Sequence, residues 1–206
     1  MTNTINLSKG ALIKFGHYQY SNNISEPIQW LILDTSENEA LLISKFGIAC
    51  KQYNREYIRI TWEQCDLRKW LNNEFLNNSF SAGETDAIIV SHLSNNENPE
   101  FHTDGGNDTN DRIFCLSLTE AMTYIQDDSE RKCLPNPQII KNEPYMRNDC
   151  CFWWLRSPGR FPTHASRIGP DGSVVVRGHL VNDDHYTVRP AMRINIKSYL
   201  KTDNFL

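Results

Sequence analysis

The sequence predicts an α+β fold: a small twisted antiparallel sheet with two main flanking helices and long irregular loops. Strand-like segments open and close the chain, and capped helices lie between them. This order differs from the regular alternation of strands and helices that builds a parallel sheet. The chain has 206 residues, a length that suits one domain. We therefore expect a single domain over 1–206, with its core at about 10–197 and flexible tails at 1–9 and 198–206.

The first fifty residues predict three strands. They are rich in apolar and β-branched residues and lie at 11–15, 28–33 and 40–44. The second and third are separated by Asp34-Thr35-Ser36-Glu37-Asn38. Short polar side chains of this kind bond to their own backbone in turns, so we expect a hairpin.

Three helix starts are predicted next, each from a Ser or Thr that is followed three residues later by Glu or Gln. These capping boxes are Thr61 to Gln64, Ser81 to Glu84 and Ser117 to Glu120. The stripe that should face the sheet after the first box consists of Leu67, Trp70, Leu71 and Phe75. The corresponding stripe after the third box consists of Leu118, Ala121, Met122 and Ile125. The sequence thus predicts two amphipathic helices and one short one.

Loops and strands fill the rest of the chain. A buried strand is expected at 112–116, and the aperiodic stretches 94–110 and 130–149 are long enough to suggest binding loops. Four further strands are expected at 152–155, 165–168, 173–177 and 188–196. Pro170-Asp171-Gly172 predicts a hairpin turn between the middle two.

Charge and hydropathy exclude several classes of function. Lys and Arg number 21 against 25 Asp and Glu, a net charge of -4, whereas nucleic-acid binders are usually basic. No apolar run reaches the roughly 20 residues that cross a bilayer, and residues 1–10 lack an apolar signal-peptide region. We expect no nucleic-acid partner, no membrane and a cytoplasmic protein, with an extracellular location or a phage particle as alternatives.

The chain contains no motif for a nucleophile elbow, a phosphate loop, a zinc protease or a dinucleotide fold. Its six cysteines, at positions 50, 65, 115, 133, 150 and 151, include no CxxC pair. We interpret them as reduced residues of the core. We therefore predict that the protein is not an enzyme, and a cysteine nucleophile with a loop histidine is the alternative.

One polar loop has the composition of a cation site. Asp104, Asp108 and Asp111 follow one another around Gly105-Gly106. Oxygen ligands on a tight loop suit Ca²⁺, although the spacing differs from that of an EF-hand. The competing interpretation, which we prefer, is that these aspartates cap turns.

Large polar and aromatic side chains concentrate between residues 154 and 186. The candidate ligand-binding residues are Trp154, Arg160, His164, Arg167, Arg177, His179, Asp183, His185 and Tyr186. Alternate residues of a strand share a face, and Tyr, Trp and Arg are the types that dominate binding energy at interfaces. An ordinary solvated sheet face would have the same composition and is the alternative interpretation.

Several segments, in order between about residues 10 and 196, resemble a bacterial domain family of unknown function common in Firmicutes. They are PIQWLILD, TWEQCDLRKWLNNEF, GGNDTNDRIFCLS, WWLRSPG and VRPAMRINI. Through WWLRSPG and VRPA this family is similar to the bacterial C-type lectin fold, to formylglycine-generating enzymes and to variable ligand-binding proteins of diversity-generating retroelements. The resemblance implies a C-type-lectin-like sheet whose first and last strands pair. It supplies no catalytic residue, because the enzymes' cysteine pair does not map onto any two cysteines here.

Together these features predict a non-catalytic module that presents the 160–186 surface, helped by the 94–110 loop, to a protein or glycan ligand. A structural or sensor subunit of a phage or intracellular defence assembly is the first alternative. A cysteine-dependent enzyme is the second. No cofactor is expected apart from the calcium ion considered at the aspartate loop.

Overall fold

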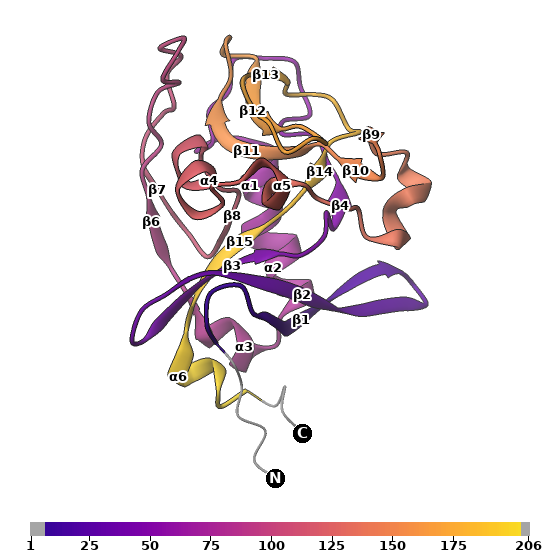
Figure 1. Ribbon diagram of the computed structural model, residues 1–206, viewed down its shortest axis with the longest axis vertical. Coiled ribbons are helices and arrows are strands. Elements are labelled where there is room, and N and C mark those ends of the chain that lie inside the picture. Colours follow the sequence, from indigo (N-terminus) through magenta and orange to yellow (C-terminus); the bar gives the residue numbers. More distant parts are fainter. Residues whose placement is uncertain (1–6, 203–206) are drawn as a thin grey trace.

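Two sheets share one hydrophobic core in the computed structural model, which describes residues 7–202. The first sheet contains β1 (Leu12–Ser21), β2 (Ile24–Thr35), β3 (Glu39–Ser44), β15 (Ala191–Asn195) and β5 (Ile88–Ile89), with β8 (Ile113–Phe114) also paired to β15. The second contains β13 (Val174–Leu180), β12 (His164–Ile168), β11 (Trp153–Pro158), β14 (Thr187–Val188) and β4 (Ala49–Cys50). It lies above the first in Figure 1. Pairing is antiparallel except between β11 and β14. The structure thus confirms an α+β protein built mainly of antiparallel sheet.

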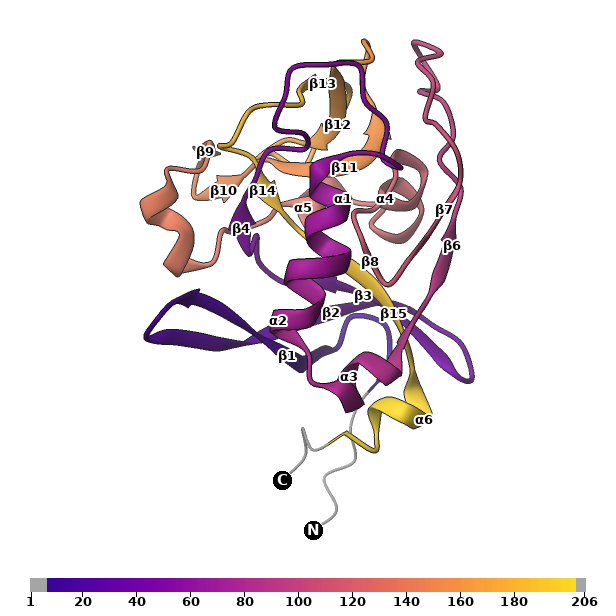
Figure 2. The same cartoon turned by 180° about the vertical axis from the view of Figure 1, so that it is seen from behind.

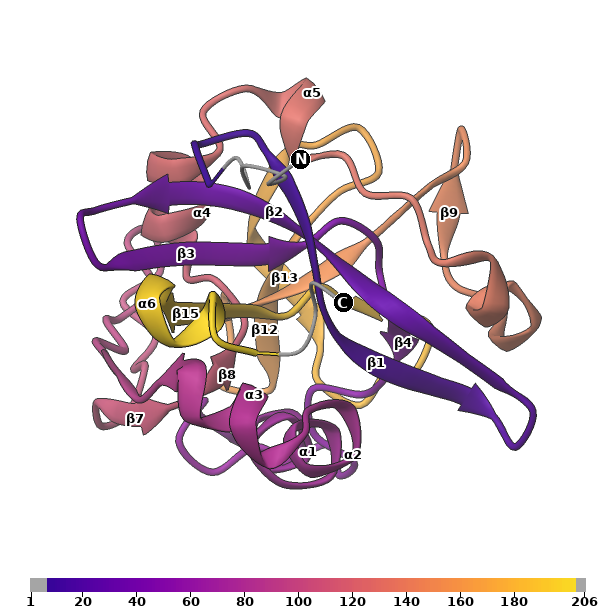
Figure 3. The same ribbon diagram turned by 90° about the horizontal axis from the view of Figure 1, so that it is seen from below.

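The first three predicted strands are present, and the hairpin between β2 and β3 is confirmed. β1 and β2 run further than predicted and form a long hairpin of their own. Figure 3 shows β2, β3 and β15 side by side. The expectation that the first and last strands pair is wrong, because β15 pairs with β3 and β5 while β1 pairs with β2.

The strand predicted over 188–196 is also corrected. β14 ends at Val188 in the second sheet, and β15 begins at Ala191 in the first. Pro190 between them has no N–H for a ladder, so the chain changes sheets there. The carbonyl of Pro190 accepts from Ser44 N at 2.8 Å, and buried Arg189 donates Nε to Ser44 O at 2.9 Å.

One continuous helix crosses between the sheets in Figure 2. It consists of α1 (Asp66–Trp70), the π-helical turn η1 (Leu71–Phe75) and α2 (Leu76–Ser79). Its predicted capping box is wrong: residues 61–65 form a turn, and Cys65 caps the helix by accepting from Arg68 N. Leu67, Leu71 and Phe75 are buried as predicted, whereas Trp70 is only half-buried.

The other two capping boxes are confirmed. They begin α3 (Ala82–Ala87) and α4 (Leu118–Tyr124), and each shows both reciprocal hydrogen bonds. α4 buries Leu118 and Ala121, but Met122 is 45% exposed, so it does not belong to the predicted stripe. Local hydrogen bonds therefore set these helix starts, and packing decides which side chains the helix buries.

The two long loops contain short elements. The stretch 94–110 is closed by the pairing of β6 (Ser91–Leu93), just before it, with β7 (Thr109–Asp111) at its end. The region 130–149 contains the end of α5 (Asp128–Arg131), the 3-10 helix η2 (Pro137–Asn142) and β9 (Met146–Arg147), which pairs with β10 (Cys150–Cys151). α6 (Ile196–Tyr199) follows β15. The Pro170-Asp171-Gly172 turn joins β12 to β13 as predicted, with Gly172 at a φ of +86°.

Candidate functional site

The strand register places three candidate residues on one face of the second sheet. Trp154 of β11 pairs with Arg167 of β12, and Arg167 pairs with Val175 of β13. Ala165 pairs with His179, so Trp154, Arg167 and His179 point to the same side. We call this side the outer face, and the segment 181–186 folds back against it.

Two candidates form the buried floor of this face. Tyr186 is 2% exposed, and its ring centroid lies 4.4 Å from that of Trp154 and 5.1 Å from that of His179. Trp154 is fully buried and donates Nε1 to Lys51 O at 2.9 Å. Neither ring is accessible to a ligand, whereas the sequence analysis predicted an exposed, ligand-binding role for Tyr186. Both instead fix the residues that cover them.

Arg167 lies half-buried on this floor. Its guanidinium carbon is 4.5 Å from the centroid of Phe152 and 5.0 Å from that of Tyr186. Nη1 donates to the Tyr186 hydroxyl, and the enclosed Nε has no hydrogen-bond partner among the described residues. Burial, followed by the positive charge of Arg177, lowers the pKa of Arg167 to about 10.

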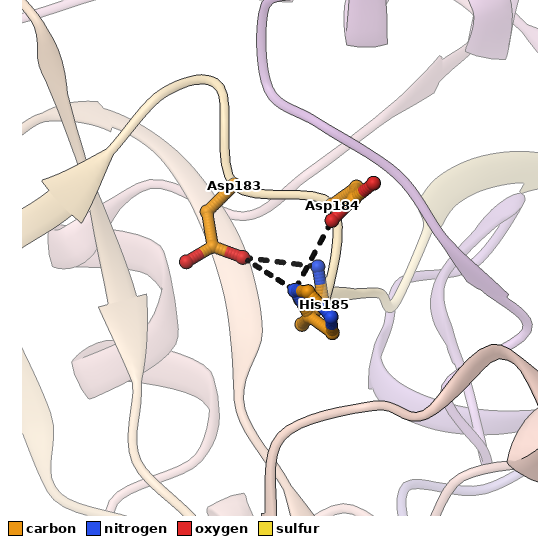
Figure 4. A group of neighbouring side chains, drawn as sticks. All are labelled: Asp183, Asp184 and His185. Carbon is orange, nitrogen blue, oxygen red and sulfur yellow. Dashed lines mark hydrogen bonds and ion pairs between the residues drawn. The ribbon is translucent and has the colours of Figure 1, made fainter.

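Asp183 links two histidines at the edge of the face. Its Oδ2 lies 3.1 Å from His179 Nε2, and its Oδ1 lies 3.2 Å from His185 Nδ1. Oδ1 also accepts the backbone N–H of His185 at 3.0 Å, and the His185 ring stacks on Tyr145 at 4.6 Å. Burial, followed by the charge of Arg167, lowers the pKa of His179. Figure 4 shows Asp183 and Asp184 converging on the His185 ring.

Within residues 7–202, Asp183, Asp184 and His185 are also the one set of three whose ligand atoms could meet at a metal ion. The three are consecutive residues of one turn. Hydrogen bonds and ion pairs within the turn account for their approach, since His185 contacts both carboxylates. The arrangement therefore needs no ion to hold it together.

Of the remaining candidates, Arg160 lies in the segment before β12, His164 is the first residue of β12 and Arg177 lies in the middle of β13. Exposed Arg160 stacks over Phe101 and Phe161, with its guanidinium carbon 5.6 and 5.1 Å from the ring centroids. The His164 ring lies 5.3 Å from Phe161, and burial followed by the charge of His179 lowers the pKa of His164. Arg177 is exposed, and its carbonyl accepts from Arg160 N at 2.9 Å.

A pocket of about 430 Å³ opens beside Arg160, between the segments 59–64, 101–104 and 162. Fully buried Asn98 braces its wall: Nδ2 donates to Pro158 O and Val176 O, and Oδ1 accepts from Glu100 N and Phe101 N. The loop 94–110 therefore contacts β11 and β13 through Asn98. Sequence reasoning missed Asn98, Tyr145 and the pocket, because only the fold brings these segments together.

The structure does not gather the three aspartates of the proposed calcium loop. Asp111 is buried, with Oδ1 2.7 Å from Arg68 Nε and Oδ2 2.9 Å from Trp62 Nε1. Asp108 accepts from Asn95 N and lies near His92, and Asp104 accepts from Gly106 N. Each carboxylate thus serves a different turn or ion pair.

All six cysteines are free thiols, and four of them are buried. Burial raises the pKa of Cys50 to about 11 and that of Cys65 to about 12, and it also raises that of Cys115 and Cys150. The pKa of Cys151 lies far above its usual range, first because of its hydrogen bond with Cys133 and then because of burial. These five thiols are therefore poor nucleophiles at neutral pH. Buried Cys133 is the exception, because burial is outweighed by its hydrogen bond with Cys151 and the charge of Arg189, which lower its pKa.

Comparison with known proteins identifies one family. A family model described as a domain of unknown function, DUF6273, matches residues 37–196. The matched range runs from the turn before β3 to the end of β15 and includes the whole outer face. No curated protein and no solved structure matches the chain. Among the described residues, no helix is long and apolar enough to cross a membrane.

Proposed function

The chain belongs to the DUF6273 family, and on this premise we propose that it is a non-catalytic binding module. The outer face of the second sheet, with the adjoining 94–110 loop, would take a protein or glycan ligand. Binding modules of this kind hold a few aromatic and cationic side chains in fixed positions and leave their tips accessible.

The observation that carries the proposal is a rigid aromatic floor beneath accessible polar side chains. Trp154 and Tyr186 are buried, whereas Tyr145 is 43% exposed and the side chain of His185 is 40% exposed. Because the floor fixes the rotamers above it, a ligand would find these groups already ordered. Preorganisation of this type reduces the entropy that binding costs.

We also propose that the fold is the C-type-lectin-like fold of a bacterial family, as the sequence resemblance implies. The WWLRSPG segment forms β11 at the centre of the second sheet, and VRPA forms the passage between the two sheets. One segment therefore forms the central strand of the second sheet, and the other forms the connection between the two sheets. An experimentally determined structure that aligned with no C-type lectin domain over both sheets would refute this assignment.

A glycan array and affinity capture from the source organism would test the function. Exposed Arg160 and Arg177 are changed together to Glu, and the control is Lys14→Glu at an exposed position of β1. We expect a ligand that binds the wild type and the control but not the double variant. Absence of any ligand, or equal binding by all three proteins, would contradict the proposal.

The two alternatives remain distinguishable from it. A cysteine-dependent enzyme needs a stabilised thiolate that a substrate can reach. Five thiols have raised pKa values, and Cys133, whose pKa is lowered, is only 1% exposed. A subunit of a phage or defence assembly would co-purify with the products of neighbouring genes in a stable complex. Size-exclusion chromatography of the co-expressed proteins would detect such a complex.

A further inference from the structure

We propose that the outer face holds a carboxylate of the ligand, seated against Arg167 and Arg177. This inference rests on the proposed function, since it names the chemical group that the same face would recognise. The carboxylate could belong to an acidic amino-acid side chain or to an acidic sugar, which share this chemistry.

The first step is that Arg167 is a partly desolvated cation without an ion-pair partner in the described part of the chain. Elsewhere, Arg68, Arg131 and Arg156 each form an ion pair with an Asp or Glu. No acidic residue of the described chain lies within ion-pair distance of Arg167 or Arg177. Because removing a cation from water is costly unless it is paired, an anion supplied by a ligand would be stabilised here.

The acid best placed to neutralise Arg167 is already engaged. Asp183 acts on Arg167 through its charge, but its Oδ2 contacts His179 and its Oδ1 contacts His185. Neither oxygen forms an ion pair with the guanidinium of Arg167. The positive charge of Arg167 is therefore left for an external group.

The geometry of Arg167 selects the direction of approach. Phe152 and Tyr186 stack against the guanidinium, Nε is enclosed, and Nη1 donates to Tyr186. The edge formed by Nη1 and Nη2 remains, and Nη2 has no partner among the described residues. Two N–H groups on one planar edge match the two oxygens of a carboxylate.

Arg177 supplies a second positive charge close enough to act on Arg167. It lies on β13 between Val175, which pairs with Arg167, and His179, which pairs with Ala165. β13 is irregular between these two pairs, so alternation does not fix the side of Arg177, but its positive charge reaches Arg167 and, after burial, is the second cause of the lowered pKa of Arg167. Two arginines that repel each other in the free protein would both be relieved by one bound anion.

Nuclear magnetic resonance titration at constant ionic strength tests the inference with small probes. Glucuronate and N-acetylglutamate amide carry the carboxylate, and glucose and N-acetylglutamine amide are their neutral counterparts. We expect only the carboxylate probes to shift the Arg167 Nε–Hε signal saturably, with the more strongly shifting pair of probes indicating sugar or amino acid. Equal shifts by a neutral counterpart, or binding of inorganic phosphate as tight as that of the carboxylates, would overturn it.

Variants separate this site from general electrostatics. Arg177→Gln is exposed and should fold, and it should weaken the carboxylate probes several-fold, while Lys14→Gln should not. Arg167→Lys keeps the charge but loses the planar edge, so it should also weaken binding. Unchanged binding in Arg177→Gln would refute the site.

If the carboxylate probes do not bind while a macromolecular ligand still depends on Arg160 and Arg177, only this inference fails. If the probes bind but no macromolecule does, the proposed function fails.

Discussion

The side chains of the outer face are of two kinds: buried side chains that form its floor, and exposed side chains that a ligand could contact. Tyr186 and Trp154 contact several rings and have almost no exposed surface, although the sequence analysis gave them as candidates equal to Arg160 and His185. Alternation along a strand predicts which side a residue faces. It does not predict that the 181–186 segment folds back and covers part of that side.

Cysteine reactivity is one property decided at this scale. At pH 7 we expect an alkylating reagent to modify the partly exposed Cys150 and Cys50 slowly, and the four buried thiols only after unfolding. The reason is that burial raises the pKa of both accessible thiols and leaves little thiolate. Mass spectrometry of timed samples measures the rates. One thiol that reacted much faster than free cysteine would favour the enzyme alternative.

His179 makes the stability depend on pH. Its folded-state pKa is lowered by burial and by Arg167, so the unfolded chain binds the proton more readily. Stability attributable to His179 is thus retained above the unfolded pKa of about 6.5 and falls as the pH drops through that value. Melting temperatures between about pH 7.5 and 5.5 should decline less steeply for His179→Asn than for the wild type. The control is His102→Asn, whose side chain is 73% exposed; equal slopes in His179→Asn and the wild type would contradict the assignment.

Elements follow the sequence where their signals are local. Ser81 and Ser117 begin helices as predicted, because the capping box closes within four residues. Thr61 and Gln64 match the same capping-box motif, yet the chain forms a turn there and Cys65 caps the helix. The strand predicted across Arg189 and Pro190 failed for a similar reason: its division depends on contacts with Ser44, far away in the sequence.

The crossing helix provides a test of its orientation. Trp70 lies at the side of the helix, with Lys51 Nζ 4.8 Å from its ring, whereas Leu71 is fully buried. We expect Leu71→Ala to cost about 2 to 5 kcal/mol through the cavity it leaves. Trp70→Ala should cost less, about 1 to 2 kcal/mol, because part of the Trp70 side chain is already in contact with solvent. Urea denaturation measures both, and a larger loss for Trp70→Ala would mean that the helix is rotated.

At the scale of the whole molecule, the α+β class and the antiparallel sheet could be predicted from the order of elements. The division into two sheets could not, because one core joins them and apolar periodicity is the same in both. The candidate site could be predicted only in part, because some of its contacts are made by tertiary packing. Its arginines and histidines lie on two adjacent strands and the following turn, but Tyr145 and Asn98 reach it through tertiary packing.

Arg189 connects the two sheets and provides the test of their cooperation. Its Nε donates to Ser44 O of β3, and its guanidinium carbon lies 5.1 Å from the ring centroid of Trp153 in β11. Arg189→Met would leave a buried carbonyl unpaired while keeping most of the volume, at a cost of about 1 to 3 kcal/mol. Since the core is shared, tryptophan fluorescence and far-ultraviolet circular dichroism should lose signal at one common, lowered midpoint. The exposed control Arg55→Met should melt as the wild type does. Separate transitions for the two signals in the wild type would show that the sheets unfold independently, and an unchanged midpoint in Arg189→Met would show that Arg189 does not hold them together.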